Sequence, residues 1–138
     1  MKRINAPKYL RIIPKYASET IHFLRKIYRY KGERVILDFS DVIEMTEGDF
    51  VVIMAQTEKA HYDNKTFFYI SPRNVKNTIK KIIEKTLTKI GDVKDTVNGV
   101  EKKATTELIG EFYSVIFSPS NLKSAMRKIK SLSRSLQF

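Results

Sequence analysis

The fold is decided by the segment RVILDFSDVIEMTEGD at positions 34–49, where a predicted strand leads into a predicted helix. Positions 34–39 form a continuous rather than an alternating apolar run, which is typical of a buried strand of a parallel sheet. Thr46 and Asp49 have the spacing of a capping box, in which a hydroxyl caps the helix start and an acid three residues later bonds back. We therefore expect a helix from there to about residue 61. A strand followed directly by a helix is the building unit of α/β proteins.

Strand-like and helical segments alternate along the rest of the chain. Further strands are expected at 9–13, 65–70 and 111–117, and further helices from Ser18 to residues 31–32, from residues 71–72 and from residues 118–119. Both later helices are expected to begin at Ser-Pro, because serine caps a helix and proline suits its first position. Residues 91–110 are weakly amphipathic and contain Gly99, which favours an insertion or a mobile loop over a regular element of the domain.

This order predicts a single α/β domain over residues 1–138. Its sheet is expected to be mainly parallel, with four to five strands, and to be flanked by helices. In such a sheet the carboxyl ends of the strands and the helix starts share one edge, where binding usually occurs. Thr46, Ser71 and Ser118 are expected at that edge.

Composition excludes several classes of site. The 138 residues contain no cysteine, which rules out disulfides and thiolate metal sites, and the two histidines do not suggest a zinc site. No apolar stretch approaches the ~20 residues of a membrane helix, and the first residues lack a signal-peptide core. The expectation is a cytoplasmic protein with no membrane insertion and no cofactor.

The net charge of +11 allows a nucleic-acid partner. Lysine outnumbers arginine 18 to 8, however, and lysine rows opposite an apolar stripe are common on any solvated helix. One segment has the opposite sign, since residues 38–49 contain five acids and no base. The alternative function is a basic protein that associates with nucleic acid through cationic helix faces. Its candidate residues are Lys76, Lys80, Lys81, Lys85, Lys123, Arg127 and Lys130.

The segments VILDFSDV at 35–42 and MTEG at 45–48 resemble the STAS domain (sulfate transporter and anti-sigma factor antagonist), as a divergent, STAS-like member. In that family a buried strand ends in Asp-Leu-Ser-x-Val, and the next helix begins with Asp-Ser-Ser/Thr-Gly. The resemblance implies a nonenzymatic regulatory module that binds other proteins, with a kinase-type ATPase as a possible partner. It implies a partner-binding surface at Asp41, Glu44, Thr46, Glu47, Gly48 and Asp49.

The chain departs from the family at its phosphorylated serine. Glu47 stands there, or Gly48 if the register slips by one, and Thr46 takes the place of the preceding aspartate. One hypothesis is that Glu47 acts as a fixed negative mark; the simpler interpretation is that an acid suits the first turn of a helix. Thr46 is a candidate phosphorylation site, although capping is its simpler role. Apolar residues of the last predicted helix could instead support a homodimer.

No catalytic signature is found. The acids of residues 38–49 suggest Mg²⁺ or phosphoryl chemistry, but a receiver-like site also needs an acidic pair after the first strand, and residues 13–16 offer none. No glycine-rich phosphate loop, nucleophile elbow or zinc-protease motif is present. The sequence therefore predicts a protein that is not an enzyme and has no metal site.

Overall fold

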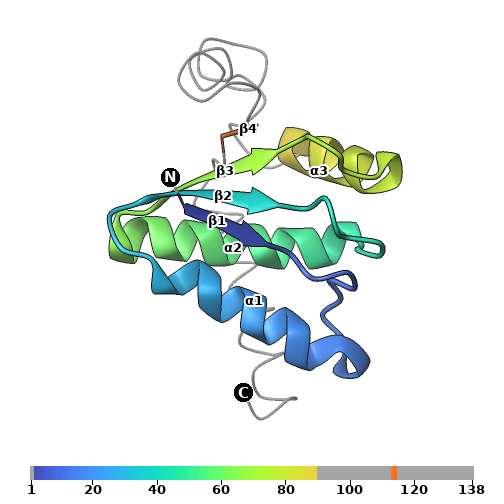
Figure 1. The fold of residues 1–138 in the computed structure, drawn as a ribbon, viewed down its shortest axis with the longest axis horizontal. Coiled ribbons are helices and arrows are strands. Elements are labelled where there is room, and N and C mark those ends of the chain that lie inside the picture. Colours follow the sequence, from blue (N-terminus) through green and yellow to red (C-terminus); the bar gives the residue numbers. More distant parts are fainter. Residues whose placement is uncertain (1, 90–112, 115–138) are drawn as a thin grey trace.

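A computed structural model describes residues 2–89 and 113–114 of the chain (Figure 1). Three strands, β1 (Lys2–Asn5), β2 (Arg34–Asp38) and β3 (Phe67–Ser71), pair in parallel and in chain order. The helices are α1 (Ala17–Arg29), α2 (Glu47–Asn64) and α3 (Asn77–Lys89). The two-residue β4 (Tyr113–Ser114) pairs antiparallel with β3. Within the described residues, the α/β prediction is confirmed as a sheet of three parallel strands with three helices.

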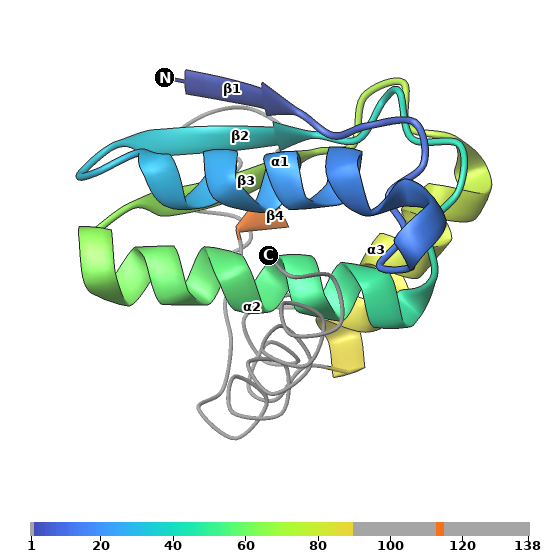
Figure 2. The same cartoon turned by 90° about the horizontal axis from the view of Figure 1, so that it is seen from below.

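Helices α1 and α2 cover the same face of the sheet and lie side by side (Figures 1 and 2). The strands turn alternate side chains toward these helices, because successive residues of a strand point to opposite faces. Val35 and Leu37 of β2 thus join Phe68 and Ile70 of β3 in the core. Helix α3 packs against α2 and adds Ile79, Ile83 and Leu87 to the same core.

The predicted strand at 9–13 is wrong. The first strand is β1, a charged segment in which only Ile4 is buried. Residues 9–13 form a loop instead, and Tyr9 makes a single isolated bridge with Glu44. The apolar residues of this loop are explained by packing rather than by strand pairing, since Leu10 is fully buried.

Two predicted helix starts are displaced. Helix α1 follows a short 3-10 turn at Pro14–Tyr16 and begins at Ala17, one residue before the predicted start at Ser18. Ser71 is the last residue of β3, where it pairs with Asp38, and a turn with Asn74 in the left-handed region delays α3 until Asn77. The second Ser-Pro helix start and the segment 91–110 lie outside the described residues.

The strand predicted from residue 34 and the helix predicted after the capping box are confirmed. Helix α2 begins at Glu47 behind a complete capping box formed by Thr46 and Asp49, and β2 occupies the predicted apolar run. The helix continues to Asn64, three residues past its predicted end, and closes with Lys65 in the left-handed conformation. The carboxyl ends of β1, β2 and β3 share one edge, since Asn5 pairs with Asp38 and Asp38 with Ser71.

Candidate functional site

The candidate site is the acidic rim, which we define as residues 38–49 between the end of β2 and the first turn of α2. Hydrogen bonds at the start of α2 order one end of this rim. The Asp49 carboxylate accepts hydrogen bonds from the backbone N–H of Thr46 at 2.9 Å and from its hydroxyl at 2.8 Å. The Asp49 N–H in turn donates to the Thr46 hydroxyl oxygen at 3.2 Å. These bonds fix the angle at which the rim enters the helix.

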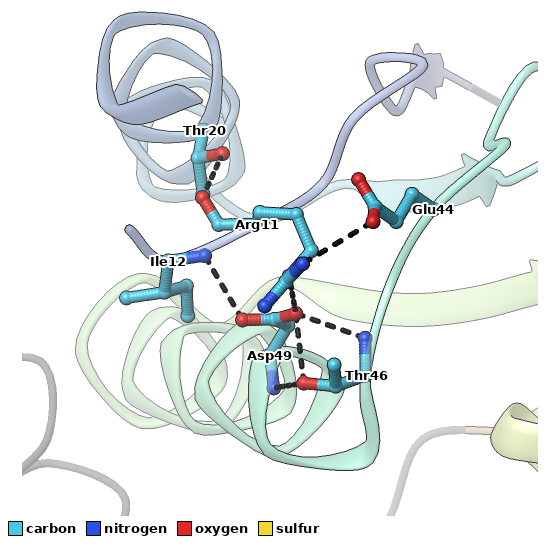
Figure 3. A network of polar contacts seen from close by, with 6 residues as sticks. All are labelled: Arg11, Ile12, Thr20, Glu44, Thr46 and Asp49. Atoms are coloured by element: carbon cyan, nitrogen blue, oxygen red, sulfur yellow. Dashed lines mark hydrogen bonds and ion pairs between the residues drawn. The ribbon is translucent and has the colours of Figure 1, made fainter. Parts of the chain in front are cut away.

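Asp49 also holds the loop that precedes α1 (Figure 3). Its carboxylate accepts a hydrogen bond from Arg11 Nε at 2.8 Å and one from the Ile12 N–H at 2.9 Å. Arg11 extends the network, because its guanidinium lies 3.4 Å from Glu44 and its carbonyl oxygen accepts a hydrogen bond from the Thr20 hydroxyl. One buried carboxylate thus joins α1, α2 and the loop between β1 and α1.

The backbone of the rim is held along its length. The N–H groups of Ile43 and Glu44 donate to Lys8 O at 2.7 and 3.2 Å, and Leu10 N–H donates to Glu44 O at 3.0 Å. Val42 and Met45 anchor the loop in the core. Between them Ile43 points outward with 46% of its surface exposed. The rim therefore presents one apolar side chain on a fixed backbone.

Asp38 closes the other end of the rim. It forms an ion pair of 2.8 Å with Arg3 and accepts a hydrogen bond from the Ser40 N–H at 2.9 Å. Partial burial opposes ionisation of the Asp38 carboxyl, but the hydrogen bonds from Ser40 and the charge of Arg3 outweigh it, so its pKa lies below the ordinary value. Asp38 is therefore negatively charged at neutral pH.

The predicted partner-binding residues fall into two groups. Four are exposed at the rim, namely Asp41, Glu44, Thr46 and Gly48. Glu47 is partly exposed and lies 3.9 Å from Lys85 of α3. Asp49 differs, because it is buried and its carboxylate is used inside the network. The hydroxyl of Thr46, the phosphorylation candidate, both donates to Asp49 and accepts from it.

The basic residues of the alternative function lie on a different element. Lys76 is exposed just before α3, and Lys81 and Lys85 are exposed on that helix, whereas Lys80 is half-buried. Lys123, Arg127 and Lys130 lie outside the described residues. Within residues 2–89 and 113–114, no group of three or more histidines or acids is arranged to hold a metal ion.

Sequence reasoning missed two residues of this site. Ile43 is the one large apolar residue exposed in the rim, and its signal is an apolar residue among the acids of residues 38–49. Arg11 carried no signal, because it lies 38 positions from the carboxylate it binds. Only the fold brings the two together.

No family model, no curated protein and no solved structure matches this chain. None of the helices in the described part of the chain is both long and apolar enough to cross a membrane.

Proposed function

We propose that this chain is a nonenzymatic, STAS-like regulatory module that binds a protein partner through the acidic rim. The observation that carries the proposal is the exposure of Ile43 on a backbone fixed by Lys8 and Leu10. Exposed acids, Asp41 and Glu44, stand on either side of it. Protein interfaces commonly combine an apolar anchor with a polar surround in this way.

The rigidity of the rim supports binding. A loop that is already ordered loses little conformational entropy when a partner binds, so more of the contact energy appears as affinity. The chemistry of the rim favours a partner with a small apolar pocket and basic residues around it. A kinase-type ATPase, which the STAS resemblance implies, is the partner class that we propose.

Glu47 is the residue on which regulation depends in this proposal. It lies in the first turn of α2, where a negative charge interacts favourably with the helix dipole. We propose that it supplies permanently the charge that phosphorylation supplies at this position in the family. The partner-binding state is then constitutive. A Glu47→Ser variant that keeps full partner affinity would contradict this hypothesis.

Affinity purification from native cells, with and without nuclease, tests the proposed function. Wild type is compared with Ile43→Glu and Glu47→Lys, and with Glu19→Lys as the matched control. Glu19 is exposed and lies in the first turn of α1, so it receives the same charge change away from the rim.

The expected result is a protein partner that survives nuclease, is lost with both rim variants and is retained by Glu19→Lys. Nucleic acid as the only co-purifying species would overturn the proposal. Equal loss in all three variants would also overturn it, because Glu19 lies outside the rim and the loss would then not depend on the rim.

A further inference from the structure

A second surface lies at the opposite end of the strands from the acidic rim. The aromatic edge, which we define as His61, Tyr62 and Phe67, joins the last turn of α2 to the first residue of β3. The ring of His61 lies 5.5 Å from that of Tyr62 and 5.0 Å from that of Phe67, measured between centroids. Tyr62 is 61% exposed and Phe67 is 50% exposed. Two exposed rings thus flank the half-buried ring of His61.

A hydrogen bond and ring contacts hold these rings in place. His61 Nδ1 lies 3.0 Å from the Thr66 carbonyl oxygen, and the ring of His61 contacts those of Tyr62 and Phe67. The backbone is held as well, since Phe67 N–H donates to Glu33 O at 2.9 Å. The exposed rings therefore form a prepared surface rather than loose side chains.

Hydrogen bonds also connect the loop between α1 and β2 to the residues beside the aromatic edge. Gly32 N–H donates to Asn64 O at 2.7 Å, and the Thr66 hydroxyl donates to Tyr30 O at 2.7 Å. These bonds join the loop between α1 and β2 to the loop between α2 and β3, which lie together at the amino ends of the strands (Figure 1). Residues from both loops therefore surround the aromatic edge.

The charge around the aromatic edge is strongly positive. Five basic residues there are exposed, whereas Glu58 is buried and Glu33 is half-buried. The exposed acid, Asp63, accepts a 2.6 Å hydrogen bond from Tyr28. None of these five bases makes an ion pair with any residue that the structure describes, although Lys59 lies over the ring of Tyr28. The five are Arg29, Lys31, Arg34, Lys59 and Lys65.

We propose that the aromatic edge binds single-stranded nucleic acid. Tyr62 and Phe67 offer rings on which unpaired bases stack, and stacking on exposed aromatic rings is the usual way in which proteins bind single strands. Arg34, which is next to Phe67 in the β2–β3 register, and Lys65 bind the phosphates. An acidic peptide fits the cations but leaves the rings unused, and a duplex hides its base faces.

This inference does not rest on the proposed function of the acidic rim. The two surfaces lie at opposite ends of α2, whose 18 residues span about 27 Å. An Ile43→Ala variant is therefore expected to retain oligonucleotide binding, so the two proposals succeed or fail separately.

Fluorescence anisotropy with the full chain tests the inference. The probes are labelled oligouridylate and oligodeoxythymidylate, which separate RNA from DNA as the natural ligand, and a duplex of the same length. Phe67→Leu retains apolar bulk but removes the ring, whereas Phe67→Tyr and Tyr62→Phe keep the rings. Circular dichroism confirms that each variant is folded.

The expected result is that Phe67→Leu and Tyr62→Ala each weaken single-strand binding by about fivefold or more, whereas the ring-preserving variants do not. Arg34→Gln is expected to make the affinity less dependent on salt. The proposal is overturned if neither single strand binds, if the duplex binds equally well, or if the ring-removing variants bind like wild type. It is also overturned if polyglutamate competes with the labelled single strand as well as an unlabelled oligonucleotide does. A Phe67→Leu variant that loses self-association of the chain but keeps its affinity for single strands would overturn it too.

Discussion

Asp49 carries more of the local structure than any other residue of the acidic rim. Only 7% of its side chain is exposed, and its carboxylate binds Arg11, Ile12 and Thr46. Asp49→Ala leaves a partly buried guanidinium and a backbone N–H without their acceptor. We expect the free energy of unfolding to fall by about 3 kcal/mol, measured by urea denaturation.

Thr46→Ala is the comparison for Asp49→Ala. It removes the cap of α2 but leaves the bond between Arg11 and Asp49, so we expect a loss of only about 1 kcal/mol. Equal losses in the two variants would contradict the central role of Asp49. The loop before α1 would then be held by Leu10 and its packing alone.

Glu58 is predicted to make stability depend on pH. Burial raises the pKa of its carboxyl above the ordinary value, although the nearby His61 and the hydrogen bond from Tyr62 oppose the shift. A raised pKa in the folded state means that stability falls as pH rises from the ordinary value through the raised one. We expect Glu58→Gln, which can still accept the Tyr62 hydrogen bond, to be more stable than wild type at pH 7.

The difference between Glu58→Gln and wild type is expected to disappear below about pH 4, where the carboxyl is protonated in both states. Thermal unfolding across this pH range measures it. Glu19→Gln, at an exposed acid of α1, is the control and is expected to show no such trend. A difference that grows toward low pH would contradict the sign of the argument.

At the scale of elements, the sequence predicted those whose signals are local. The capping box and the apolar run of β2 each lie within a few residues, and both were confirmed. β1 was missed because only Ile4 of its four residues is buried, whereas the loop at 9–13 contains a longer apolar run. The start of α3 was displaced because pairing with Asp38 extends β3 through Ser71. That pairing joins residues 33 positions apart, beyond the reach of local patterns.

The end of α2 supports a prediction at this scale. Lys65 caps the helix with φ at 56°, a left-handed conformation that is unfavourable for a residue with a side chain, and its N–H donates to His61 O at 3.0 Å. Lys65→Gly relieves this conformation, so we expect the free energy of unfolding to rise by about 0.5 kcal/mol.

Two variants of the same region test the sign of the Lys65 effect. Lys65→Val is expected to destabilise the fold, because a β-branched residue fits the left-handed region poorly. Lys59→Gly, inside the exposed face of α2, is expected to cost about 1 kcal/mol. If glycine lowered stability at both positions, the helix end would not be strained.

At the scale of the whole molecule, the sequence located one candidate surface and missed the other. The acidic rim is continuous in sequence, so its charge pattern was visible, although its apolar anchor Ile43 was not singled out. The aromatic edge combines His61 and Tyr62 of α2 with Phe67 of β3. Phe67 was interpreted as part of an apolar strand, and nothing local indicates that it is half exposed. Contact between elements creates this surface.

The net charge of +11 gives the last prediction, which concerns the response of the whole chain to salt. Excess positive charge destabilises the compact state by self-repulsion, and salt screens that repulsion. Three of the four ion pairs between described residues have a well-exposed partner, and such pairs contribute only about 0–1 kcal/mol each. The fourth, Arg11–Asp49, is largely buried and is therefore screened little by salt. We therefore expect the Tm to rise between about 20 and 300 mM NaCl, a range over which the Debye length shortens severalfold.

Oligonucleotide affinity is expected to fall over the same range, because phosphate contacts weaken with salt. Calorimetry and anisotropy on one preparation measure both. A falling Tm would mean that ion pairs, rather than self-repulsion, dominate the electrostatics of the fold.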